Sequence, residues 1–214
     1  MILLFFSAAV VFSSLIILLR NKTFTKIVSV LYAGLLIVFT FYSWNNLNRT
    51  ELGYFNFNSA GVLLLSVLAL LGIPTVYHGF IYTSGDDPKK HSIYHAALIM
   101  LMTFMAGAYL ANGMTMLWIF VEATTLAVAA LIYHDRSEAA LEATWKYVFI
   151  CSTGIALAYL GILFLGFIYG RGDAANLSFD TLAGLIKQAN PLYLKIAFLF
   201  VLVGFSTKMG LFPM

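Results

Sequence analysis

The sequence contains few charged residues. Asp, Glu, Lys and Arg make up 10% of its 214 residues, whereas about 25% is usual in a soluble domain. Hydrophobic residues make up 62%, and the mean hydropathy is +0.93. This composition excludes a soluble globular enzyme. It also excludes a disordered chain, because disordered chains are poor in aromatic residues, which here reach 16%.

Cysteine and the common catalytic motifs are also scarce or missing. The one cysteine, Cys151, lies inside an apolar run, so the chain can form neither an internal disulfide nor a cysteine-rich metal cluster. There is no phosphate-binding loop, no dinucleotide fingerprint and no Ser-His-Asp order. The net charge of +3 is too small for a nucleic-acid-binding face. We therefore expect no nucleic-acid partner, no metal, no cofactor and no redox or hydrolytic centre in this chain.

Seven apolar stretches of membrane-spanning length are separated by polar turns. A helix needs about 20 apolar residues to cross a bilayer, and the stretches cover residues 2–19, 27–44, 59–82, 93–110, 114–133, about 143–169, and 192 onwards. The first stretch lacks the flanks of a signal peptide and is interpreted as a retained span. The sixth carries Gly154 and Ala158, whose spacing lets membrane helices approach closely. The predicted fold is an all-α, polytopic bundle of about seven transmembrane helices.

The segments between these spans predict the topology. Residues 45–58 are expected to form a loop, and residues 170–190 a longer polar segment with a short surface helix near 181–188. Lys and Arg are enriched in cytoplasmic loops. Loops after the first, third and fifth spans hold six such residues and the other loops hold three: Arg20, Lys22, Lys26, Lys89, Lys90 and Arg136, against Arg49, Arg171 and Lys187. We expect a multi-pass protein of the inner (plasma) membrane, with its N-terminus outside.

Two ionisable residues, Glu122 and Lys208, lie inside apolar spans. Glu122 is the ninth residue of the fifth span, and Lys208 lies about sixteen residues into the seventh. A charge at a helix centre costs about 2.5–3.5 kcal/mol and usually marks an ion or proton path. We interpret both as charge-relay groups that partner each other or another subunit; Thr125 shares the helix face of Glu122. The alternatives are a protonated structural carboxylate at Glu122 and an interfacial position for Lys208.

Helix-breaking residues follow Lys208. Gly210 loosens the next turn, and Pro213 cannot donate a hydrogen bond to the carbonyl of Met209. A broken membrane helix is tolerated where its freed backbone lines a cavity or is buried in protein, and broken helices beside a charge recur at transport sites. The seventh span is therefore predicted to be discontinuous, with an ordinary proline kink as the alternative.

Glu142 and Lys146 form a third polar feature. They are four residues apart, with the glutamate first, which is the favoured order for an ion pair on a helix. One interpretation is a solvated or interfacial pair. The other is that Lys146 faces the bundle and relays charge toward Glu122.

The histidines are less specific. The pattern places His91 and His134 in loops and His95 at the start of the fourth span. Histidines can relay protons, but each of these is interpreted as an interfacial residue.

Three segments resemble a known protein family. They are WIFVEATTLA at 118–127, LEATWKY at 141–147 and GFSTKMGLFP at 204–213. They resemble the antiporter-like proton-pumping subunits of respiratory complex I, of Mrp-type cation/proton antiporter complexes and of membrane-bound hydrogenases. The sequences of the first two segments look most like hydrogenase-4 component F. The similarity is specific over residues 94–214 and only architectural over the first three spans.

The resemblance implies roles for individual residues. Glu122 matches the family's glutamate on the fifth span, and Lys208 matches the lysine on the discontinuous seventh span; the two are thought to exchange charge as protons pass. Lys146 falls where several members carry a lysine at the start of the sixth span. The resemblance further implies a subunit without a cofactor, whose partners are other membrane subunits, the lipid bilayer and protons.

Family members are longer and contain two inverted repeats, so the sequence is expected to be an N-terminal fragment truncated within the seventh span. Residues 1–92 would hold spans one to three, and residues 93–214 an incomplete first repeat with spans four to seven. The predicted function is proton translocation by Glu/Lys charge relay in a redox-driven complex of hydrogenase-4 or NADH-quinone oxidoreductase type. A subunit of an Mrp-type sodium/proton antiporter and a non-transporting membrane scaffold are the alternatives.

Overall fold

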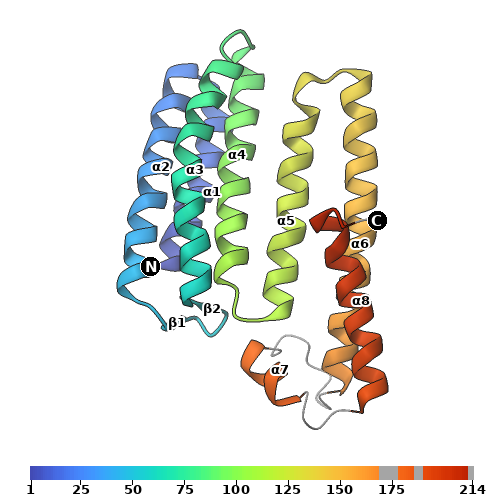
Figure 1. The fold of residues 1–214 in the computed structure, drawn as a ribbon. Helices are drawn as coiled ribbons and strands as arrows, with labels where there is room; N and C mark the ends of the chain where they lie inside the picture. Colours follow the sequence, from blue (N-terminus) through green and yellow to red (C-terminus); the bar gives the residue numbers. More distant parts are fainter. Residues whose placement is uncertain (169–177, 186–189, 212–214) are drawn as a thin grey trace.

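The computed structural model describes residues 1–168, 178–185 and 190–211, which are almost wholly helical (Figure 1). The long helices are α1 (Ile2–Leu19), α2 (Lys22–Asn45), α3 (Ser59–Tyr82), α4 (Pro88–Leu110), α5 (Met114–Ile132), α6 (Glu138–Ile168) and α8 (Pro191–Met209). The smaller elements are β1 (Thr50–Glu51), β2 (Phe55–Asn56), the 3-10 helix η1 (Tyr133–Asp135) and α7 (Phe179–Leu185). The seven long helices are each long and apolar enough to cross a membrane. The predicted all-α bundle of about seven spans is confirmed.

Three helices begin earlier than the apolar stretches predict. α2 starts at Lys22, where the Asn21 side chain accepts a hydrogen bond from the Thr23 backbone N–H. α4 starts at Pro88, and α6 starts at Glu138. Long charged side chains can reach the membrane surface while their backbone continues the helix. The hydropathy pattern therefore underestimates these helices at their charged ends.

The C-terminal part agrees with the prediction only in outline. α8 is continuous until Gly210 ends it with φ +64°, in the left-handed region that favours glycine. The predicted surface helix near 181–188 corresponds to α7, which starts earlier, and the last part of that prediction lies outside the described residues. Other predicted features lie outside the described residues: Arg171, Lys187 and the helix break at Pro213.

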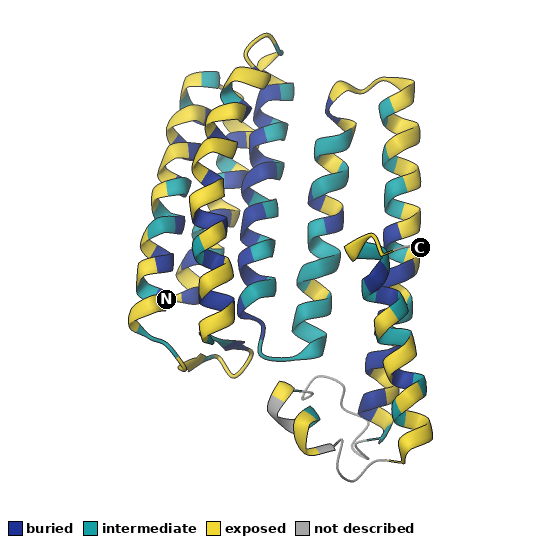
Figure 2. Ribbon diagram, in the orientation of Figure 1, coloured by how far each residue is buried: buried dark blue, intermediate teal, exposed yellow. Residues whose placement is uncertain are grey.

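Helices α1 to α4 form a tight bundle, with α4 between α1–α3 and α5 (Figure 1). Figure 2 shows that α4 carries the most buried residues. The core is aromatic: Phe5 stacks on Phe39 with ring centroids 4.3 Å apart. The hydroxyl groups of Tyr32 and Thr103 share a hydrogen bond of 2.9 Å, which satisfies both inside the bundle.

The loops after α1, α3 and α5 lie at the same end of the molecule (Figure 1). There, Lys22 of α2 donates a hydrogen bond from Nζ to the backbone oxygen of Ser84 at 3.1 Å. We call this the lysine-rich end, after Lys22, Lys26, Lys89 and Lys90. Its loops belong to the set that the charge count predicts to share one side of the membrane.

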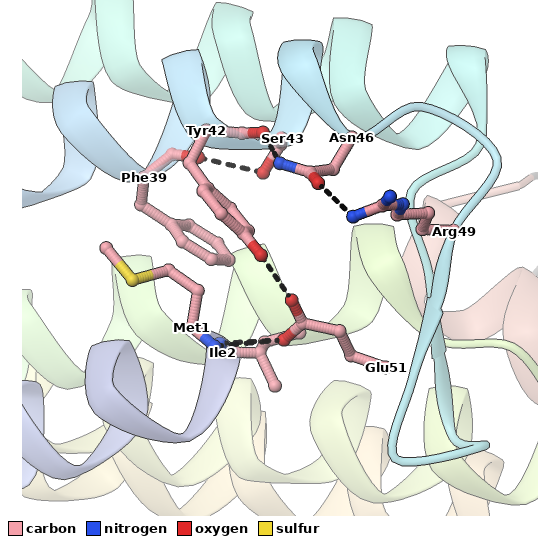
Figure 3. A network of polar contacts seen from close by, with 8 residues as sticks. All are labelled: Met1, Ile2, Phe39, Tyr42, Ser43, Asn46, Arg49 and Glu51. Carbon is pink, nitrogen blue, oxygen red and sulfur yellow. Dashed lines mark hydrogen bonds and ion pairs between the residues drawn. The ribbon is translucent and has the colours of Figure 1, made fainter.

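A small hairpin stands where a plain loop is predicted between α2 and α3. Strands β1 and β2 pair antiparallel, and Phe55 of β2 and the nearby Phe57 are buried. Glu51 of β1 gathers three donors (Figure 3): the Ile2 backbone N–H at 3.0 Å, the Tyr42 hydroxyl at 2.7 Å and the Met1 ammonium at 3.3 Å. Burial alone would raise the pKa of the Glu51 carboxyl, but these donors favour the charged form and hold that pKa below its usual 4.5.

Replacing Glu51 with Gln is expected to lower the stability of the folded chain at neutral pH by about 1 kcal/mol. A folded-state pKa below the unfolded one stabilises the fold above the unfolded pKa, and this stabilisation is lost as pH falls through the folded pKa. The unfolding temperature of the wild type should therefore drop more steeply than that of E51Q as pH falls below about 4.5. Thermal unfolding in detergent measures both slopes, and parallel curves would contradict the assignment.

Small residues bring α6 and α8 into close contact, as the spacing of Gly154 and Ala158 predicts. A Cβ atom added at Gly154 would collide with the Thr207 side chain. One added at Gly204 would collide with the backbone nitrogen of Ala158, which cannot move aside as a side chain can. The two helix backbones therefore approach one another at these positions.

The substitution Gly204→Ala is expected to destabilise the chain by about 1–3 kcal/mol, the usual effect of overpacking. Gly34→Ala is the matched control, because Gly34 is also helical but has open space where a Cβ would lie. The control should leave the unfolding temperature unchanged or raise it, since alanine is the better helix former. Equal unfolding temperatures for the two variants would argue against close α6–α8 contact.

Candidate functional site

Glu122 lies at the middle of α5 and is directed toward α6. Its side chain is partly buried, and the Ser152 hydroxyl of α6 donates to Oε1 at 2.9 Å. α5 and α6 are consecutive antiparallel helices, so the two residues meet about halfway along both (Figure 1). The carboxylate is thus held by a neighbouring helix inside the spanning region.

Lys208 lies in the last turn of α8, and α8 reaches only to the middle of α6 (Figure 1). The preceding residue, Thr207, packs against Gly154, which is near the centre of α6. Lys208 is therefore carried to the level of Glu122 rather than to a helix end at the surface of the bundle. This placement favours the intramembrane interpretation of the lysine over the interfacial one.

Thr125 connects the two ionisable residues. Lys208 donates a hydrogen bond from Nζ to Thr125 Oγ1, and that oxygen lies 3.5 Å from Glu122 Oε2 and 3.3 Å from the Val121 carbonyl. A hydroxyl has one proton to donate. While it accepts from the ammonium, Thr125 can direct that proton either to the carboxylate or to the backbone.

The fold therefore brings Glu122 and Lys208 together, but through an intervening side chain. Among the described residues, no ion pair within 4.0 Å joins them directly. Thr125 is fully buried, so water does not screen the bridge from that side. The Lys208 ammonium also lies over the Tyr147 ring, 5.6 Å from its centroid, which adds a cation–π contact.

Sequence reasoning misses Ser152 and Tyr147 as site residues. A hydroxyl in the centre of an apolar span is a signal that identifies Ser152. Tyr147 offers no such signal, because its approach to Lys208 depends on the pairing of α6 with α8. Cys151 is buried next to Ser152, as expected for a packed thiol.

Lys146 is not brought to Glu122. Its Nζ pairs with Glu142 Oε1 at 2.5 Å, and the two side chains are 69% and 67% exposed. This is the solvated or interfacial arrangement of the two interpretations that the sequence leaves open. In the described structure Lys146 does not face the bundle.

The loop position predicted for His91 is wrong, and the structure buries three of the histidines. His91 belongs to α4 rather than to a loop, and His95 lies one turn further along the same helix; both are fully buried. His134 lies in η1, is 8% exposed, and pairs through Nε2 with Asp86 Oδ2 at 2.7 Å. In the described part of the chain, no group of three His, Cys, Asp or Glu residues could hold a metal ion.

Comparison with known proteins identifies relatives. A family model described as NADH:quinone oxidoreductase/Mrp antiporter, TM, matches residues 111–214. The chain is 32% identical over 132 residues to a hydrogenase-4 component F homolog of Methylacidiphilum infernorum, covering 60% of this chain and 28% of the relative. It is 25% identical to NADH-quinone oxidoreductase subunit N of Desulforudis audaxviator, covering 71% and 29%. It is 23% identical to an Na(+)/H(+) antiporter protein of Bacillus subtilis, covering 71% and 30%.

The fold has a counterpart among solved structures. It matches a chain of the membrane-bound sulfane sulfur reductase, an archaeal respiratory membrane complex, with a TM-score of 0.81 at 17% identity. The match covers 99% of this chain and 45% of the other, whereas the curated relatives above are matched over less than a third of their length. The resemblance seen in the sequence is thus confirmed: residues 111–214 match the model of the NADH:quinone oxidoreductase/Mrp antiporter family of transmembrane proteins, and the chain is similar to a hydrogenase-4 component F homolog and to NADH-quinone oxidoreductase subunit N.

Proposed function

We propose that this chain is part of a proton-translocating membrane subunit in a redox-driven complex of hydrogenase-4 or NADH-quinone oxidoreductase type. The observation that carries the proposal is the Glu122–Thr125–Lys208 arrangement at the middle of the spanning helices. Opposite charges this deep in a membrane protein are costly to keep, and they are typical of proton relays. The names of the relatives support the class of complex.

The proposed mechanism is a charge relay between two sites. A carboxylate at Glu122 favours the ammonium form of Lys208, because opposite charges attract strongly where water is scarce. When Glu122 is neutralised or its hydroxyl bridge turns away, the ammonium loses that stabilisation and releases its proton. Restoring the bridge favours the uptake of the next proton by the Lys208 amine.

Thr125 supplies the geometry for this switch. Its hydroxyl has two acceptors within reach, Glu122 and the Val121 carbonyl, and only one proton. With the proton on the carboxylate, the two charged groups are linked by consecutive hydrogen bonds. With the proton on the carbonyl, Lys208 keeps its acceptor but loses the link to Glu122.

Lys146 remains a proposed third member of the relay, on the strength of its place at the start of α6 in the family resemblance. To act on Glu122 it would have to leave Glu142, its ion-pair partner on the same helix. Exposed pairs of this kind contribute only about 0.3–0.5 kcal/mol, so the pair itself is a weak restraint on Lys146.

The proposed partners are other membrane subunits, in the inner membrane with the N-terminus outside. α5 has few buried residues and is mostly of intermediate exposure (Figure 2), and exposed apolar side chains on α8 are available to lipid or to other helices. We further propose that residues 93–214 form the first part of the antiporter-like repeat, with residues 1–92 packed beside it. The family match from residue 111 onwards supports that division.

The test is proton uptake by membrane vesicles that contain the whole assembled complex. Uptake that follows addition of the electron donor supports the proposal. Uptake that follows only an imposed sodium gradient would support the alternative of an Mrp-type antiporter subunit, for which the Bacillus subtilis relative is the motivating observation. Unaltered proton transport after substitution of both Glu122 and Lys208 would support the alternative of a non-transporting scaffold.

A further inference from the structure

A buried group of two imidazoles and one hydroxyl lies near the lysine-rich end, outside the Glu122 site. Thr83 directly follows α3, and His91 and His95 lie on successive turns of α4. Their exposed fractions are 0%, 1% and 0%. Ionisable residues buried in spanning helices are rare and usually functional, and the charge relay does not use these. We call the three residues the imidazole cluster.

The fold makes specific room for this cluster. A Cβ atom added at Gly79 of α3 would lie 3.0 Å from Cε1 of His95, so glycine is what allows the ring to approach the α3 backbone. The Phe80 ring covers the imidazole of His95 with centroids 4.9 Å apart. The rings of His91 and His95 are themselves 4.6 Å apart.

Hydrogen bonds link the cluster into a line. Thr83 Oγ1 lies 2.6 Å from His91 Nδ1 and 3.4 Å from His95 Nε2. The same hydroxyl can donate to the Gly79 carbonyl at 2.7 Å. A hydroxyl between two imidazoles can accept a proton from one and donate its own to the other.

Both ends of this line are open. His91 Nε2 and His95 Nδ1 are buried, and neither has a hydrogen-bond partner in the described part of the chain. A buried polar atom without a partner is costly, so such atoms are usually satisfied by an internal water. Two open nitrogens at opposite ends of one hydrogen-bonded line are the feature that carries the inference.

We propose that the imidazole cluster is a proton wire with a bound water molecule at each end. A proton arriving from water on His91 Nε2 releases the Nδ1 proton of that ring to Thr83. The hydroxyl proton of Thr83 passes to His95 Nε2, and His95 releases its Nδ1 proton to the second water. One proton enters and one leaves, only N–H and O–H bonds change, and tautomer exchange resets the rings.

The surrounding charges favour a wire over a proton store. Burial opposes a resident imidazolium on these histidines, and the positive charges of Lys22 and Lys26 of α2 oppose it further. Asp86 is nearby but is already paired with His134. Tyr94 and Tyr82 surround His134 with their rings. A neutral imidazole can still pass protons, because it accepts on one nitrogen as it releases from the other.

A polar seam continues from the cluster into the bundle. Ser92 of α4 and Thr25 of α2 have their hydroxyl oxygens 3.4 Å apart. One turn further along α2, Ser29 is fully buried and its hydroxyl has no partner among the described residues. Tyr32, on the same face of α2, then meets Thr103. Ser29 is a third buried polar atom whose simplest partner is water.

The wire rests on the proposed function only for its purpose, so its first test does not require pumping. The full chain would be placed in lipid nanodiscs with isotope-labelled histidine, and tautomer exchange would be followed by nitrogen NMR. We expect His91 and His95 to contact water and to exchange tautomers at one shared rate. Thr83→Val should slow that rate by about tenfold or more, whereas Thr83→Ser should keep it. Imidazoles without water contact, or a tautomer-exchange rate that Thr83→Val leaves unchanged, would overturn the proposed wire.

Proton uptake by the assembled complex supplies the second test. Thr83→Val should slow donor-driven uptake, and Thr83→Ser should restore it. If Thr83 had only a structural role, uptake could fall in Thr83→Val without any change in the tautomer-exchange rate. A wild-type complex that moves no protons would refute the proposed function, yet a shared tautomer rate in the nanodiscs would still support the wire. Normal uptake together with an unchanged tautomer rate in Thr83→Val would refute the wire alone.

Discussion

Replacing Lys208 with Ala is expected to reduce donor-driven proton uptake by about 100-fold, the usual scale for the loss of a proton-transfer group. The ammonium is the only cation that the described structure places against Thr125 and Tyr147. Lys195→Ala is the matched control, because Lys195 is on the same helix but is exposed near its start. The control should leave uptake unchanged. Assembly is checked on native gels, and electron transfer is measured separately.

Glu122→Gln belongs to the same prediction, because the carboxylate acts through Lys208. The single variant should lose about tenfold in uptake, and the double variant should be no slower than Lys208→Ala alone. Losses that multiply would mean that the two residues act independently. Normal proton uptake by the Lys208→Ala complex would support the alternative that the protein is a non-transporting scaffold.

Hydropathy predicts the seven spans because each helix must be apolar over the thickness of the membrane. It fails at helix ends, where Lys22 and Glu138 continue the helix at the surface. It also misses the β1–β2 hairpin, since strands of two residues are too short to show an alternating pattern. Their position depends on the burial of Phe55 and Phe57 against distant helices.

The sequence predicts which residues form the candidate site, but it does not predict the hydrogen bonds that connect them. An ionisable residue in an apolar span is visible in the sequence, and helix periodicity places Thr125 beside Glu122. That Thr125 bonds Lys208, which is 83 residues away, depends on how α5, α6 and α8 pack. The imidazole cluster is hidden for the same reason, because the His95 ring packs closely against Gly79, which lies on another helix.

Thr125→Val is expected to slow donor-driven proton uptake strongly while leaving the volume of the side chain nearly unchanged. A hydrogen bond to a charged group contributes about 1.5–3 kcal/mol, and about 1.36 kcal/mol corresponds to a tenfold change in rate. We therefore expect a loss of about 10- to 100-fold. Thr125→Ser keeps the hydroxyl and should retain most of the uptake.

Thr124→Val separates this bridge from a general effect of removing a hydroxyl from α5. Thr124 is the neighbouring residue, and its hydroxyl donates to the Val121 carbonyl at 2.6 Å. It shares that carbonyl with Thr125, but the bond from Lys208 goes to Thr125. Equal losses in the Thr124 and Thr125 variants would mean that α5 is merely destabilised. A loss confined to Thr125→Val, and reversed by serine, would mean that the charge passes between Lys208 and Glu122 by way of this hydroxyl.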